Sequence, residues 1–219
     1  MPRLFVLTLL CLIAAVQSAA AMTYSLAMFD DGRCRDQCRQ AIVAQGEILV
    51  DEPERLVAFL SGLDLPGGVP ANVLISSPGG NVRGALALGL GLRRLGARLI
   101  VARVGASSQG GVGVGPGQCA SACVFVLMGG RSRVVPDGSR VVVHQPRRMG
   151  VEQRDIVGSG GIDSRIAGGS VTQLLQSYAT SMGVDPALIS LADSVPNESA
   201  RELTRAELRR FRLATGQGR

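Results

Sequence analysis

The chain has 219 residues, of which 46% are hydrophobic, and a formal net charge of +6. This length and apolar content predict one folded domain with a sizeable core and exclude an intrinsically disordered chain. All 23 basic residues are arginines, because the sequence contains no lysine, and only 3% of the residues are aromatic. Scattered arginines with so few aromatic rings argue against nucleic-acid binding, which uses clustered positive charge and stacking platforms.

The first 21 residues have the three parts of a secretory signal peptide. Arg3 gives a basic start, residues 4–16 are apolar, and small residues at 18–21 provide a cleavage site after Ala21. The alternative is an uncleaved N-terminal anchor, although the apolar run is short for a bilayer span. We expect a mature protein that is periplasmic or secreted, without stable membrane insertion, and that has lost Cys11 with the peptide.

The first half of the mature chain alternates between short strands and helices. Strands are predicted at 23–29, 42–50, 72–76 and 99–104, and helices at 51–63 and 81–96. The order strand, glycine-rich turn, helix, strand over 72–104 is typical of a βαβ unit. The sequence therefore predicts an α/β fold whose mixed, mostly parallel sheet is covered by helices.

The second half opens with a long loop of small residues at 105–117 and ends in helices. Helices are predicted at 121–129, 170–182, 186–192 and from 204, and strands at 133–135 and 140–144. The segment 147–169 is polar and glycine-rich, with little periodicity. With no internal repeat and no visible boundary, we expect a single domain over 22–214 and a disordered tail at 215–219.

Two side chains suit nucleophilic catalysis. His144 is the only histidine and closes the apolar strand "SRVVVHQP", at the end of a strand where open α/β sheets commonly place their sites. Ser121 opens an apolar helix after the glycine-rich loop. A serine hydroxyl needs an adjacent base and donors for the oxyanion, roles that suit His144 and the Gly79–Gly80 turn. The same residues also fit a structural histidine and a serine without a catalytic role.

Three stretches occur in a fixed order: "SPGG" after a strand, "ASA" at the start of an apolar helix, and "PDGSRVVVHQP". Over about 73–146 they resemble the Clp protease proteolytic subunit, a family of the crotonase-like superfamily, and a subgroup of predicted exported proteins with this core. The resemblance implies a crotonase/Clp protease-like fold of repeated ββα units. It also implies a serine-type peptidase acting on a peptide or protein substrate. No metal or cofactor is expected.

The resemblance implies a role for each matching residue. Ser121 would be the nucleophile and His144 the general base, and the backbone N–H groups of Gly80 and Ala122 would form the oxyanion hole. The runner-up interpretation is a catalytically inactive domain of this fold, in which Ser121 and His144 are relics and the groove binds a peptide or protein partner. A third is a disulfide-stapled structural protein.

Departures from the family pattern limit what the resemblance implies. The family has an Asp before the last helix, and none stands at the matching place, so Glu198 is the candidate to orient His144 and Asp193 the alternative. Both also fit solvated surface acids. The segment after "HQP" differs from the family's ring-building segment, so a homo-oligomer is compatible with the sequence but a barrel is not carried over. The absence of lysine excludes a Ser–Lys dyad, and export argues against chemistry on coenzyme A thioesters.

The four cysteines outside the signal peptide form two C-x-x-x-C pairs, Cys34/Cys38 and Cys119/Cys123. Four thiolates would suit zinc, but in an oxidising compartment we expect two disulfides. Three connectivities are open, and we favour pairing between the two motifs because it closes a long loop. Since Ser121 lies midway between Cys119 and Cys123, "CASAC" is a structural staple, a mount for a nucleophile, or both.

Overall fold

The structure, a computed structural model, describes residues 20–29, 39–65, 68–106, 112–145, 170–196 and 198–216. The predicted signal peptide lies outside these ranges except for its last two residues. Cys34, Cys38, the polar segment 147–169 and residues 217–219 also lie outside them.

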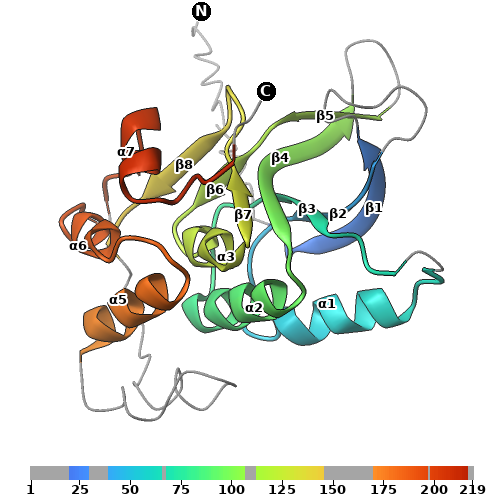
Figure 1. The fold of residues 1–219 in the computed structure, drawn as a ribbon, viewed down its shortest axis with the longest axis horizontal. Coiled ribbons are helices and arrows are strands. Elements are labelled where there is room, and N and C mark those ends of the chain that lie inside the picture. The colour runs from blue at the N-terminus through green and yellow to red at the C-terminus, as the bar shows by residue number, and fades with distance from the viewer. Residues whose placement is uncertain are drawn as a thin grey trace, which may run out of the picture.

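The larger sheet has six strands, five of which follow one another in the order β1-β2-β3-β4-β5 (Figure 1). These are β1 (Thr23–Phe29), β2 (Arg39–Gln45), β3 (Asn72–Ser76), β4 (Arg98–Ala106) and β5 (Val112–Pro116), and β7 (Ser132–Val134) pairs with β4. The central pairs β2–β3, β3–β4 and β4–β7 are parallel, whereas β1 and β5 are antiparallel to their neighbours. The predicted mixed sheet is therefore confirmed.

A smaller sheet of β6 (Gln118–Ala120), β8 (Arg140–Val143) and β9 (Arg201–Glu202) meets the larger one beside the end of β3. Ser77 follows directly on β3 and forms a parallel bridge with Cys119 of β6. Its N–H donates to the Gln118 carbonyl at 2.7 Å, and its own carbonyl accepts from Ala120 N–H at 3.0 Å. The "SPGG" and "CASAC" stretches thus meet where the two sheets meet.

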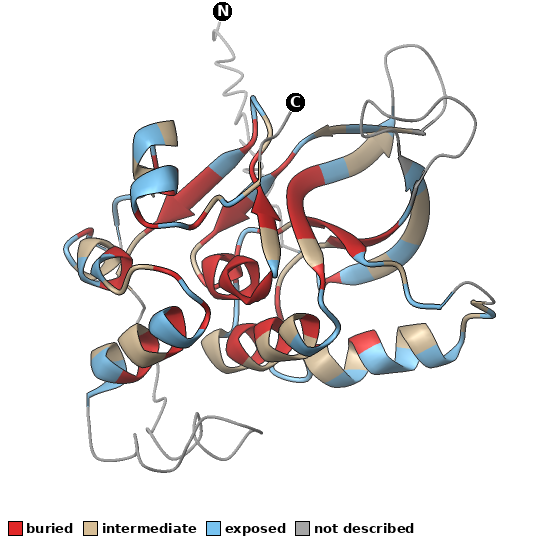
Figure 2. Cartoon of the chain, in the orientation of Figure 1, coloured by how far each residue is buried: buried red, intermediate tan, exposed pale blue. Residues whose placement is uncertain are grey.

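Six helices belong to the described part of the chain. They are α1 (Glu52–Ser61), α2 (Val82–Arg94), α3 (Cys123–Gly129), α5 (Val171–Ser181), α6 (Ala187–Asp193) and α7 (Arg205–Arg210). Figure 2 shows that α3 is buried on every side, with α2 next to it. A Cβ added to Gly129 would lie 2.2 Å from the Gly89 carbonyl oxygen, so the two helices can approach this closely only through glycine.

Apolar side chains are buried on both faces of the larger sheet. The main core lies between the sheet and the helices and includes Ile42, Ile75 and Leu99. Alternate strand residues, among them Val43 and Leu74, form a smaller cluster on the opposite face. Burial on both faces is what near-continuous apolar runs such as "NVLIS" predict for parallel strands.

Several predicted boundaries are wrong for local reasons. The strand predicted over 42–50 ends at Gln45, because Gly46 has a φ of +124° and turns the chain away. The loop predicted at 105–117 contains the end of β4 and all of β5, which pair as antiparallel neighbours. The helix predicted to open at Ser121 begins at Cys123 instead.

The C-terminal end is partly held in place. Thr215 and Gly216 were expected in the tail, but both N–H groups donate to the Arg133 carbonyl, at 2.9 and 3.0 Å. Within the described ranges, no helix has the length and apolar character needed to cross a bilayer.

Candidate active site

One cavity of about 720 Å³ collects most of the residues that the sequence singles out. Ser121, His144 and Gly80 all line it, and so does Asp193. Its apolar wall comes from α3, α5 and α6, for example Val124, Leu175 and Ile189. Residues from six separate parts of the chain therefore converge on one space, which is the arrangement expected of a binding or catalytic site.

Ser121 lies on a sharp turn between a strand and a helix. β6 ends at Ala120 and α3 begins at Cys123, and the φ of Ser121 is +53°. Left-handed backbone costs a residue with a side chain about 1–2 kcal/mol, so it persists only where the surroundings enforce it. Ser121 N–H donates to the Val142 carbonyl at 2.9 Å, and the Ser121 carbonyl accepts from Val124 N–H at 3.0 Å. The turn leaves Ser121 half-buried between two buried alanines.

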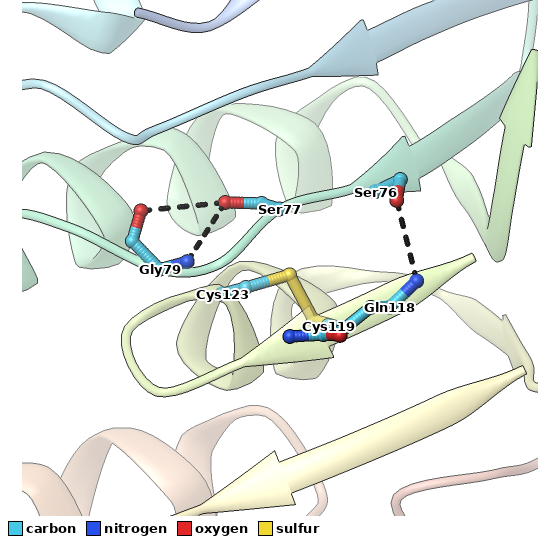
Figure 3. Close-up of a disulfide and its surroundings, with 6 residues drawn as sticks. All are labelled: Ser76, Ser77, Gly79, Gln118, Cys119 and Cys123. Carbon is cyan, nitrogen blue, oxygen red and sulfur yellow. Dashed lines mark hydrogen bonds between the residues drawn. A yellow bond between two sulfur atoms is a disulfide. The ribbon is translucent and has the colours of Figure 1, made fainter. Parts of the chain in front are cut away.

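The "SPGG" turn lies against Ser121, and glycine is required for that approach. The Ser77 hydroxyl oxygen accepts from Gly79 N–H at 3.0 Å and closes the turn (Figure 3). Gly79 has a φ of +108°, and a Cβ there would lie 2.8 Å from both the Ala120 carbonyl oxygen and the Ser121 Cβ. The structure therefore places this turn directly beside Ser121.

Two backbone N–H groups beside Ser121 have no acceptor among the described residues, those of Gly80 and Ala122. Gly80 forms a parallel β-bridge with Ile48, in which Ile48 N–H donates to the Gly79 carbonyl and Asn81 N–H donates to the Ile48 carbonyl. The N–H of Gly80 itself takes no part in this bridge. Ala122 is only 1% exposed. Buried backbone donors are rarely unpaired, which makes the Ala122 N–H notable, whereas Gly80 is exposed. Both N–H groups are chemically available to an oxyanion.

His144 follows the last residue of β8, and its ring orientation is set by the chain itself. The Nδ1 atom lies 2.8 Å from the Gln145 carbonyl oxygen. Because a carbonyl only accepts, Nδ1–H donates in this bond, which leaves the Nε2 lone pair of the neutral ring available. Gln145 is anchored in turn, since its N–H donates to the Val195 carbonyl at 2.8 Å. Among the described residues, no hydrogen bond joins the His144 ring to Ser121 Oγ.

The two candidates for the orienting carboxylate lie in different places. Asp193 ends α6 and lines the cavity, and its Oδ2 accepts from the Thr172 hydroxyl at 3.0 Å. Glu198 is exposed and is not among the lining residues. The structure thus brings the alternative, Asp193, to the cavity of Ser121 and His144, and leaves the first candidate outside it.

The cysteines beside Ser121 pair with each other. A disulfide joins Cys119 and Cys123, whose Cα atoms are 5.2 Å apart (Figure 3). Pairing between the two C-x-x-x-C motifs, which we favoured, is therefore wrong for these cysteines. The strand-to-helix turn brings the two Cα atoms within disulfide range without any partner from elsewhere. Cys34 and Cys38 lie outside the described residues.

The charge of the cavity was not predicted. Its charged lining residues are Glu47, Asp51 and Asp193, and no arginine of the described chain lines it, although the sequence has 23 basic residues. Glu47 and Asp51 reach this place because Ile48 pairs with Gly80, and no local sequence pattern indicates a pairing between residues so far apart. The cavity therefore suits a neutral or cationic group better than an anion.

No family model and no curated protein matches the chain. Among solved structures, a mutant of the 1510-N membrane-bound stomatin-specific protease is similar, with 12% identity and a TM-score of 0.50, over 81% of this chain and 77% of that one. A ClpP1 mutant from Listeria monocytogenes has 17% identity and a TM-score of 0.46, over 81% of this chain and 90% of that one. The ClpP catalytic domain of Plasmodium falciparum has 17% identity and a TM-score of 0.46, over 78% of this chain and 80% of that one. The similarity to the stomatin-specific protease shows that the protein shares the α/β fold of that protease.

Proposed function

We propose that the protein is an exported serine hydrolase, a peptidase in which Ser121 is the nucleophile and His144 the general base. The observation that carries this proposal is the position of Ser121, on a left-handed turn in the same cavity as His144 and beside two N–H groups that have no acceptor among the described residues. Export is supported by the signal-peptide pattern and, more weakly, by the disulfide, since disulfides persist in oxidising compartments.

The groups that line the cavity, together with the N–H of Ala122 next to Ser121, would supply what acyl transfer needs. His144 Nε2 takes the proton of the Ser121 hydroxyl as Oγ attacks the substrate carbonyl carbon. The N–H groups of Gly80 and Ala122 donate to the oxygen that becomes negative. When the tetrahedral intermediate collapses, the imidazolium returns the proton to the leaving amine, and water then releases the acid by the same steps. The Gln145 carbonyl holds the ring tautomer that this sequence needs.

One observation favours the second candidate, a domain of this fold that binds a peptide or protein partner without cleaving it. Ser121 Oγ and the His144 ring line one cavity but are not hydrogen bonded to each other in the described structure. A relic site would look the same. The apolar wall and the carboxylates would then serve binding alone.

Labelling with a fluorophosphonate separates the two candidates. We expect the wild-type protein to form one adduct on Ser121, located by mass spectrometry, and the variant Ser121→Ala to form none. The probe is neutral and therefore suits a cavity lined by carboxylates. Heat-unfolded wild type is the control for reactivity that does not depend on the site. Equal labelling of folded wild type and Ser121→Ala, or none of either, contradicts the enzyme and leaves the binding domain.

The carboxylate that assists His144 is expected to be Asp193. Asp193→Asn should lower the labelling rate about tenfold or more, because it removes the negative charge that stabilises an imidazolium in the cavity. Asparagine keeps an oxygen that can accept from the Thr172 hydroxyl, so the local packing survives. Glu198→Gln is the matched control, with a rate within about twofold of wild type because Glu198 is exposed. The reverse ranking would restore Glu198 as the assisting carboxylate.

A further inference from the structure

We infer that the Cys119–Cys123 disulfide is a positioning device that holds Ser121 in its left-handed conformation, with its hydroxyl facing His144. This inference rests on the proposed function, because positioning matters only where Ser121 reacts. It assigns to the two cysteines a role in the rate of acylation rather than in the global stability of the fold.

The bond closes a small ring around the reactive turn. Cys119 is the middle residue of β6 and Cys123 is the first residue of α3. Between them lie only Ala120, Ser121 and Ala122, and the two cysteines are themselves completely buried. Any change in the direction of the turn at Ser121 must therefore also move one of two sulfur atoms that are fixed in the core.

The two ends of the bond belong to different parts of the site. Cys119 bridges Ser77 at the start of the "SPGG" turn and is in register with Val141 of β8, the strand that leads to His144. Cys123 begins the helix that is buried on every side. Figure 3 shows the disulfide joining the strand at Cys119 to the helix at Cys123. The bond consequently ties the helix after Ser121 to the strands that lead to Gly80 and His144.

The disulfide adds a covalent constraint to a turn that is otherwise held by two backbone hydrogen bonds of Ser121 and by the close approach of Gly79. A φ of +53° is disfavoured for serine, and the flanking alanines offer only methyl groups for packing. Gly79 approaches so closely that the turn has little room to relax without displacing the "SPGG" backbone. A bridge between residues only four apart closes a short loop, so its effect on the entropy of the unfolded chain is at the low end for disulfides.

Full burial of both cysteines also distinguishes this role from a redox switch. Labile regulatory disulfides are strained or exposed, whereas Cys119 and Cys123 are each 0% exposed. We therefore expect the disulfide to stay formed in the exported protein. Its effect on the rate of Ser121 labelling should be seen when the cysteines are replaced.

The test compares acylation kinetics with stability in the full chain. For Cys119→Ala/Cys123→Ala, we expect the saturating rate of fluorophosphonate labelling to fall about tenfold or more, with the half-saturating probe concentration within about threefold of wild type. Each single variant should show the same labelling rate as the double variant, because either substitution removes the whole disulfide. If the cysteines acted only by packing, the losses in labelling rate of the two single variants would instead add up in the double variant. Leu74→Ala, in the cluster on the far face of the sheet, is the control that lowers the urea midpoint without lowering the rate.

Each result decides a separate question. Wild-type protein that takes no label on Ser121 overturns the proposed function itself. Labelled wild type with an equally fast double variant overturns the positioning role and leaves the proposed function intact. If the alanine pair does not fold, Cys119→Val/Cys123→Ala keeps the β6 position filled by a residue suited to a strand, and the same kinetic comparison applies.

Discussion

Replacing His144 with glutamine is expected to lower the rate of Ser121 acylation by about 10³- to 10⁴-fold while the protein stays folded. The large kinetic effect follows because the cavity offers no second base of comparable strength near neutral pH: its other titratable lining groups, among the described residues, are carboxylates. The small structural effect follows because His144 is half-buried beyond the end of β8 and its side chain bonds the neighbouring carbonyl.

The measurement is the labelling rate at neutral pH for wild type and His144→Gln, with thermal unfolding of both. Gln145→Ala is the matched control: it alters the next side chain but keeps the backbone carbonyl that orients the ring. Its rate should stay within about twofold of wild type. A fast His144→Gln variant would show that the serine reacts without this base and would remove His144 from the mechanism.

The parts of the fold that sequence predicts well are those with local causes. Asn72–Ser76 is a short apolar run buried on both faces, and α2 starts after Asn81, whose side chain accepts from Gly84 N–H at 2.9 Å. Thr204 and Glu207 form a capping box at the start of α7, where the sequence predicts that the last helix begins. In each case the signal and the structure lie within a few residues of each other.

The parts that sequence misses depend on distant partners. β9 has two residues, Arg201 and Glu202, and exists because it pairs with the end of β8. At the site, local motifs single out Ser121 and His144, whereas the choice between Asp193 and Glu198 depends on how α6 docks against the cavity. The disulfide shows the opposite case, because from the sequence we predict a distant partner where a local turn already brings Cys119 and Cys123 together.

Replacing Arg133 with methionine is expected to destabilise the protein by about 4 kcal/mol, more than any surface change, because Arg133 holds three helix ends together. The residue is 3% exposed. Its guanidinium nitrogens donate to five carbonyl oxygens, those of Met128, Gly130, Met182, Arg212 and Leu213. These carbonyls lie at the C-terminal ends of α3, α5 and α7, where helices leave acceptors unpaired and carry partial negative charge.

The charge on Arg133 persists at neutral pH despite its burial. Removal from water, together with repulsion from Arg93 and Arg212, lowers the pKa of the guanidinium from its ordinary value to about 10. Methionine fills much of the same volume but donates nothing, so several buried carbonyls would lose their partner, at about 1–3 kcal/mol for each that water cannot reach. Lysine keeps the charge on a single nitrogen and cannot span five acceptors, so Arg133→Lys should fall between wild type and methionine.

Urea and thermal unfolding measure this effect, and a loss of about 4 kcal/mol corresponds to a melting temperature lower by roughly 10 °C for a domain of this size. Arg140→Met is the matched control: its ion pair with Glu202 is exposed at 57% and 49%, so its loss should cost less than about 1 kcal/mol. Equal costs for the two variants would contradict the role of Arg133. α3 and α5 also supply the apolar wall of the cavity. In Arg133→Met, the rate of Ser121 labelling should therefore begin to fall at temperatures below the unfolding transition.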